Sequence, residues 1–137
     1  ARQALDDGEL IVIYPEGTIT ADPDTWPMTA RPGAARLALS SGCPVIPVGQ
    51  WGANFVMPGK KPVWPRFRPR RTMVFRTGEP VDLSDLLGRE DAEAAAMAGV
   101  RIMNAVTGLV AQIRGEEPPT DVYDIRVGRR VPRGAAR

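Results

Sequence analysis

The chain has 137 residues, of which 43% are hydrophobic and 25% are charged, with a formal net charge of +2, as in ordinary soluble globular domains. Its 14 prolines and 14 glycines predict short elements joined by many turns. The lack of histidine removes the commonest general base, and a single cysteine excludes an intrachain disulfide.

The first 18 residues predict a helix, a buried strand and a polar loop. Residues 2–7 resemble the end of a helix closed by Gly8. The apolar run over residues 10–14 predicts a buried strand that stops at Pro15-Glu16-Gly17-Thr18. Because open α/β sheets bind ligands at the carboxyl ends of strands, Glu16, Gly17 and Thr18 are candidate binding residues. Spacing alone also fits a structural turn in which Glu16 caps local N–H groups.

A proline-rich loop over residues 19–31 leads to a second strand. Pro32 and Gly42 fit the start and the stop of a short helix between them. Residues 45–48 then predict a strand bracketed by prolines. A strand, a helix and a strand in this order predict a βαβ unit with parallel strands.

The C-terminal half predicts one long helix and a tail. Residues 72–76 read as a third strand and residues 82–87 as a helical turn. A helix is expected over residues 92–114, with an apolar stripe that indicates core packing. Residues 116–137 hold too few apolar side chains to fold alone, so a basic, disordered tail is expected.

A basic segment over residues 59–71 carries six basic residues and two aromatic ones. This composition fits attachment to anionic lipid headgroups or to nucleic acid, and it equally fits a solvated loop. No Cys/His set fits a zinc site, and no glycine-rich loop fits a nucleotide, so the sequence predicts neither metal nor cofactor.

Three stretches in this order resemble the lysophosphatidate acyltransferase family of glycerolipid acyltransferases. Residues 14–18 are similar to its third motif, residues 44–49 to its fourth, and a Gly-Ala-Ala-Arg-Leu-Ala helix joins them. The resemblance implies an α/β fold with a mixed, partly parallel sheet and flanking helices. On this basis residues 1–115 are expected to be the C-terminal part of an acyltransferase domain.

The resemblance also implies a reaction, in which a fatty acyl group passes from acyl-CoA or acyl carrier protein to 1-acylglycerol 3-phosphate. Glu16, Gly17, Thr18 and Arg31 would bind the acceptor, and Pro44, Val45, Ile46 and Pro47 would position the acyl chain or the acceptor. The expected partners are the lysophospholipid, the acyl thioester and an anionic membrane surface, rather than nucleic acid. The expected location is peripheral, at the cytoplasmic face of the membrane.

Two departures from the family pattern shape the functional prediction. Its first motif, a His with an Asp four residues further on, supplies the base, and this chain has no His. Ile19 also stands where the third motif usually has Arg. We therefore expect a chain that lacks the N-terminal portion of the domain, binds the acceptor and is inactive alone. The alternative is a non-catalytic module whose basic segments bind anionic membrane or nucleic acid.

Overall fold

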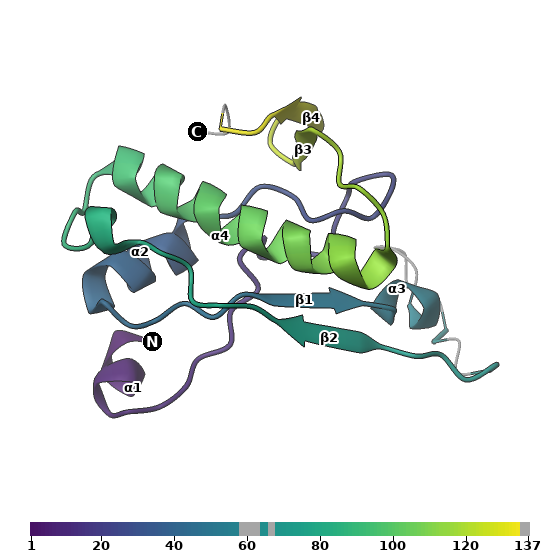
Figure 1. The fold of residues 1–137 in the computed structure, drawn as a ribbon, viewed down its shortest axis with the longest axis horizontal. Helices are drawn as coiled ribbons and strands as arrows, with labels where there is room; N and C mark the ends of the chain where they lie inside the picture. The colour runs from purple at the N-terminus through teal and green to yellow at the C-terminus, as the bar shows by residue number, and fades with distance from the viewer. Residues whose placement is uncertain (58–63, 66–67, 135–137) are drawn as a thin grey trace.

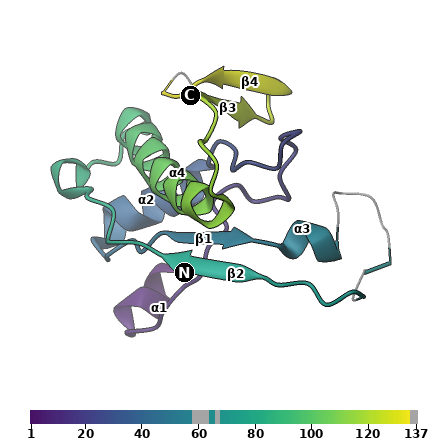
Figure 2. The ribbon, with the colours of Figure 1, turned by 45° about the vertical axis from the view of Figure 1, so that its right-hand side comes forward.

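The structure is a computed structural model that describes residues 1–57, 64–65 and 68–134. Helix α4 lies across the middle, between a β1–β2 ribbon and a β3–β4 hairpin (Figure 1), and a second view agrees (Figure 2). The elements in chain order are α1 (Arg2–Asp6), α2 (Pro32–Ser41), β1 (Val48–Trp51), α3 (Ala53–Val56), β2 (Val74–Thr77), the 3-10 helix η1 (Ser84–Leu86), α4 (Ala92–Arg114), β3 (Asp121–Asp124) and β4 (Arg129–Pro132).

The predicted helices are confirmed where their end signals are strongest. Pro32 opens α2, and Gly42 ends it in the left-handed conformation with φ +69°. The Asp91 side chain accepts a hydrogen bond of 2.8 Å from the Ala94 N–H at the start of α4. Helix α4 then runs without a break to Gly115, so the two glycines within it do not interrupt it.

The core lies where α4 packs on α2 and on the η1 segment. By length and composition α4 would also pass as a membrane-spanning helix, but 50% of its most apolar window is buried inside the fold. Its role here is that of a core helix. The core cluster consists of Ala35, Ala38, Leu39, Leu83, Leu86, Ala94, Ala95, Ala98 and Ile102.

The expected parallel pair of strands is wrong for the described residues. Residues 10–14 are irregular, with Leu10 85% and Val12 76% exposed, rather than a buried strand. An apolar run forms a strand only where a neighbour pairs with its backbone, and no described strand does so here. The described strands instead form two separate antiparallel pairs, so the sheet is not of the mixed, partly parallel kind.

The second strand begins later than its composition predicts. Pro44 and Pro47 lack N–H donors, so residues 45–47 precede the ladder and β1 starts at Val48. Their carbonyls are used nonetheless, because Val45 O accepts from the Val81 N–H (2.9 Å) and Pro47 O accepts from the Gly78 N–H (3.0 Å). Strand β1 then pairs with β2 in antiparallel register.

Glycine at position 49 allows β1 to lie directly on α4. A Cβ atom added to Gly49 would lie 2.6 Å from Leu109 Cβ and 3.0 Å from the backbone of that helix. Since no side chain tolerates such an approach, the short distance between this strand and α4 depends on glycine.

The expected disordered tail is replaced, over its described part, by a hairpin. Strands β3 and β4 pair in antiparallel register, and Gly128 turns between them with φ +68°. The segment has few apolar residues, but polar contacts with the loop over residues 19–31 stabilise the hairpin. Thr29 N–H donates to Tyr123 O (3.0 Å), and Arg130 Nε lies 2.8 Å from Asp22 Oδ2. Residues 135–137 lie outside the described residues.

The loop over residues 19–31 is also fixed against α4. The Arg114 guanidinium lies 4.0 Å from the centre of the Trp26 ring and 4.3 Å from that of Trp51. The same group donates to the carbonyl of Asp24 (2.9 Å). This long loop is therefore an ordered part of the fold, held from α4 on one side and from the hairpin on the other.

Candidate functional site

The site is built on a tight turn that residues 14–17 form. Gly17 N–H donates to Tyr14 O (3.0 Å), and Gly17 adopts φ +64°, which favours glycine. After the long loop the chain returns to this turn, where Arg31 N–H donates to Pro15 O (2.8 Å). Two predicted binding segments, 14 residues apart in the chain, thus lie side by side.

Gly17 and Arg31 are in direct contact. A Cβ atom on Gly17 would lie 2.9 Å from Arg31 Cδ and 3.1 Å from Arg31 Nε, so the glycine leaves room for the arginine. The structure therefore brings together Glu16, Gly17 and Arg31, three of the four residues that the resemblance assigns to the acceptor. Their role in binding a substrate stays a prediction at this point.

The Glu16 carboxyl group has a raised pKa because it is partly buried. Burial raises the pKa of Glu16 from its ordinary value of 4.5 to about 7, against the opposing effect of a hydrogen bond from the Met28 backbone. At neutral pH this carboxyl populates both protonation states. It is thus able to accept a hydrogen bond from a ligand hydroxyl or to donate one.

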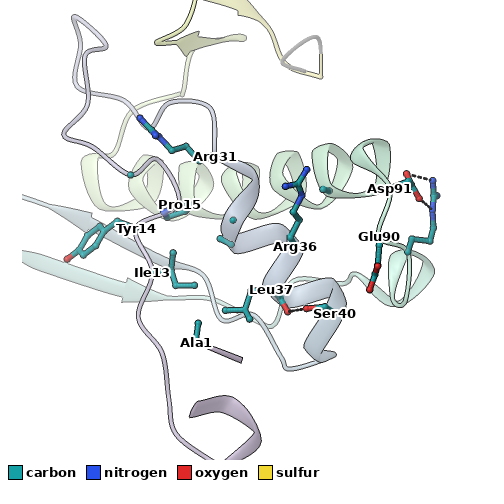
Figure 3. Close-up of a pocket in the computed structure, with 15 residues that line it drawn as sticks. Ala1, Ile13, Tyr14, Pro15, Arg31, Arg36, Leu37, Ser40, Glu90 and Asp91 are labelled. Atoms are coloured by element: carbon teal, nitrogen blue, oxygen red, sulfur yellow. Dashed lines mark hydrogen bonds and ion pairs between the residues drawn. The ribbon is translucent and has the colours of Figure 1, made fainter. Parts of the chain in front are cut away.

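A cavity of about 730 Å³ opens beside the turn, within the usual range of about 300–1,000 Å³ for ligand sites. In Figure 3, Arg31 and Arg36 project to one side of it, whereas Ile13, Leu37 and Ala1 gather on the other. The cavity thus has two arginines on one side and apolar side chains on the other, and it is also bordered by Glu90 and by Asp91, which pairs with Arg89 (2.9 Å). This arrangement suits a ligand with an anionic group and an apolar part.

The start of α2 adds to the cationic side. Arg31 is its N-cap residue, and no side chain accepts from the N–H groups of its first turn. Free N–H groups at a helix start favour an anion, and here two guanidinium groups accompany them. The Arg36 side chain was not among the sequence-based candidates. Its position one turn into the helix that Arg31 precedes is the signal that identifies it.

A second cavity, of about 490 Å³, lies on the other side of the same residues. Glu16, Arg31 and Arg36 line it together with one face of α4 and the β3–β4 hairpin. Arg31 and Arg36 therefore border both cavities. They occupy a shared polar boundary between two partly apolar spaces.

The remaining predicted site residues lie elsewhere. Thr18 and the proline-bracketed residues 44–47 line neither cavity. Val45 packs against the core and Pro47 is buried, whereas Ile46 is 50% exposed. The predicted positioning role of Pro44, Val45, Ile46 and Pro47 stays a prediction.

The described residues offer binding groups rather than a reaction centre. Ser40 borders the larger cavity, but its hydroxyl donates to Leu37 O (3.2 Å) and has no imidazole beside it. No group of three or more potential metal ligands occurs among the described residues. The arrangement is thus suited to holding an anionic, partly apolar molecule.

The N-terminal part of the chain is similar to a known protein family. Residues 1–51 match the model of a protein family described as Acyltransferase. The matched part contains Glu16, Gly17, Thr18, Arg31 and residues 44–47. No curated protein and no solved structure matches the chain. The family match supports a general role in acyl transfer, without a specific substrate.

Proposed function

We propose that this chain binds the acceptor in an acyltransferase that transfers a fatty acyl group from acyl-CoA or acyl carrier protein to 1-acylglycerol 3-phosphate. In this reaction the acceptor hydroxyl oxygen forms an ester bond with the thioester carbonyl carbon, and the thiol leaves. The family match supports the reaction class. The observation that carries the acceptor assignment is the contact between Gly17 and Arg31.

The phosphate of the acceptor fits the cationic side of the site. Arg31 presents a planar guanidinium group suited to paired hydrogen bonds with a phosphate. Arg36 and the free N–H groups at the start of α2 add positive potential next to it. Neither arginine forms an ion pair with a described carboxylate, so both charges are available to a ligand.

The glycerol part of the acceptor fits the Glu16 turn. Glu16 borders the smaller cavity, and its carboxylate form accepts a hydrogen bond from a free hydroxyl. We assign Glu16 to binding this hydroxyl and not to taking its proton. The chain has no His, so we expect the purified 137-residue chain to show no acyl transfer. Efficient transfer by this chain alone would overturn that part of the proposal.

Attachment to an anionic membrane surface at the cytoplasmic face completes the proposal, because the acceptor resides in a membrane. Much of the basic segment over residues 59–71 lies outside the described residues. Within its described part, Trp64 is 93% exposed, and Arg68, Arg70 and Arg71 are exposed too. Cationic and aromatic side chains of this kind favour an anionic lipid interface. They also keep a non-catalytic membrane-binding module as the second candidate.

Lipid binding by the purified chain separates the two candidates. The wild type is titrated with monomeric 1-acylglycerol 3-phosphate and with 1-acylglycerol, and its binding to anionic vesicles is measured in parallel. We expect Glu16→Ala to weaken binding of the soluble lipid while vesicle binding is unchanged. We expect the triple change of Arg68, Arg70 and Arg71 to Ala to do the reverse.

Two results would contradict the acceptor assignment. One is equal affinity for the lipid with and without its phosphate. The other is a Glu16→Ala variant that binds 1-acylglycerol 3-phosphate as the wild type does. In either case membrane binding by the basic segment would be the better account of the chain.

A further inference from the structure

The smaller cavity is a slot between α4 and the C-terminal hairpin. Its floor is one face of α4 between Ala92 and Asn104, a rise of about 18 Å along the helix axis. Its roof includes Val122 and Ile125 of the hairpin. The volume of about 490 Å³ falls in the range of small-molecule sites, about 300–1,000 Å³. None of the α4 or hairpin residues belongs to the part that matches the acyltransferase family.

Small and apolar side chains form the floor of this slot. Every three or four residues one of them faces the cavity, so they form a continuous strip along α4. Gly99 lacks a side chain, and a Cβ atom there would meet only Ala30 Cβ, at 3.7 Å. The strip is therefore shallow enough to leave room beneath the hairpin. It consists of Ala95, Ala96, Gly99, Val100 and Met103.

Four arginines and one glutamate are among the described residues that line the slot. Arg31, Arg36 and Arg133 line it, and none of the three forms an ion pair with a described carboxylate. The one acid among its described lining residues is Glu16, and burial raises the pKa of that group to about 7. This excess of positive charge would attract an anionic occupant and repel a cationic one. The charge thus favours an anionic molecule with an apolar body.

The hairpin is fastened over the slot by polar contacts. Arg133 donates to Asn104 Oδ1 on α4 (3.2 Å) and to Pro119 O (3.1 Å). Burial lowers the pKa of the Arg133 guanidinium, against the opposing effect of Asp121. Arg130 and Tyr123 hold the other side of the hairpin to the loop over residues 19–31. The roof is therefore attached both to the floor and to the loop that bears Arg31.

We propose that this slot holds the alkyl chain of the acyl acceptor, with its phosphate at Arg31 and Arg36 and its chain along α4 beneath the β3–β4 hairpin. The identity of the ligand rests on the proposed function. The location of the alkyl chain rests on the shape and lining of the slot. The consequence is that residues 92–104 and the hairpin determine which chain lengths bind, whereas the Glu16 turn determines the headgroup.

Filling the slot tests the proposal. Ala96 is partly buried, and Phe at this position would project into the cavity without replacing a larger group. Met97 is the next residue on α4, is exposed and lines neither cavity, so Met97→Phe is the matched control. Dissociation constants are measured for octanoyl and oleoyl 1-acylglycerol 3-phosphate, below the concentrations at which they form micelles. Circular dichroism checks that each variant folds, and Ala96→Leu provides a milder filling change.

The wild type should bind the oleoyl lipid at least about tenfold more tightly than the octanoyl lipid, because each buried methylene adds affinity. Ala96→Phe, or Ala96→Leu if the larger residue prevents folding, should remove most of this preference, because it should weaken binding of the oleoyl lipid more than that of the octanoyl lipid. Met97→Phe should retain it. If the filled variants still prefer the oleoyl lipid, the proposed location of the alkyl chain is wrong, but the proposed function still stands. Failure of both lipids to bind the wild type would overturn both.

Discussion

Arg130 in β4 makes a paired contact with Asp22, 108 residues earlier in the chain, with Nε donating to Oδ2 and Nη2 donating to Oδ1, each at 2.8 Å. Asp22 is almost fully buried, with 1% of its side chain exposed, and Arg130 is 29% exposed. Asp22 belongs to the loop that runs from the Glu16 turn to Arg31. The contact therefore joins the C-terminal hairpin to the loop that positions the candidate phosphate-binding arginine.

Arg130→Ala should destabilise the fold. Removing one partner of a buried ion pair costs about 3–5 kcal/mol, and partial exposure of Arg130 reduces the expected loss to about 2 kcal/mol in the free energy of unfolding. Chemical denaturation followed by Trp fluorescence measures it. Arg129→Ala is the matched control, because Arg129 is exposed and forms no ion pair with a described acid. Equal stability of the two variants would show that the hairpin does not depend on this contact.

Stability should also fall in acid through Asp22. Burial alone would raise the pKa of Asp22, but Arg130 and the backbone N–H groups of Trp26 and Asp24 hold it below its ordinary value of 3.8. The stabilising effect of a lowered carboxyl pKa is present above that ordinary value and is lost as the pH falls through the lower, folded value. Denaturation across the range in which carboxyl groups titrate, about pH 5 to about pH 2, should thus show a steeper loss of stability for the wild type than for Asp22→Asn. Parallel curves would contradict this account.

Glu16 should affect stability in the opposite direction. Because burial raises its pKa from 4.5 to about 7, the folded chain binds a proton more tightly than the unfolded chain. Its effect is to lower the free energy of unfolding as the pH rises from about 4.5 to about 7, by on the order of 2 kcal/mol. Glu16→Gln should remove this slope. At about pH 8, one unit above the pKa of folded Glu16, the variant should be more stable than the wild type. A variant with the same pH slope as the wild type would show that Glu16 is not the titrating group.

Gly17→Ala should damage the site more than the fold. The backbone at this position has φ +64°, which is unfavourable for alanine, and the new Cβ atom would lie too close to Arg31, whose flexible side chain is free to move aside. We expect a loss of about 1 kcal/mol in stability together with weaker binding of 1-acylglycerol 3-phosphate. The comparison is Gly108→Ala in α4, where a Cβ atom meets nothing within 4 Å and which lines neither cavity. Calorimetric titration of both variants should show a deficit for the Gly17 variant alone.

The sequence predicted the helices well because their signals are local. Capping by Asp91 and termination by Gly42 and Gly115 depend on neighbours within a few residues, and all three are confirmed. Strand pairing depends on distant partners, which composition does not specify. The apolar run over residues 10–14 therefore predicts a strand, yet no described strand pairs with it.

The sequence predicts only those parts of the candidate site whose signals are local. The turn at Glu16 and Gly17 has a local signal in Pro-Glu-Gly-Thr, whereas its contact with Arg31 joins residues that the sequence pattern does not place together. The hairpin was missed because its anchors are Asp22, Thr29 and Asn104, which lie far away in the sequence. An Arg-rich segment with few apolar residues predicts disorder when it is considered alone.

The affinity of the purified chain for monomeric 1-acylglycerol 3-phosphate, compared between the wild type and Arg31→Ala, tests the central claim most directly. Charge-assisted hydrogen bonds to phosphate are strong, so loss of Arg31 should raise the dissociation constant at least about tenfold. Arg76→Ala, an exposed change in β2 that lines neither cavity, should leave it unchanged. A dissociation constant that is the same for Arg31→Ala and the wild type would contradict the claim that the Glu16 turn and Arg31 hold the acyl acceptor.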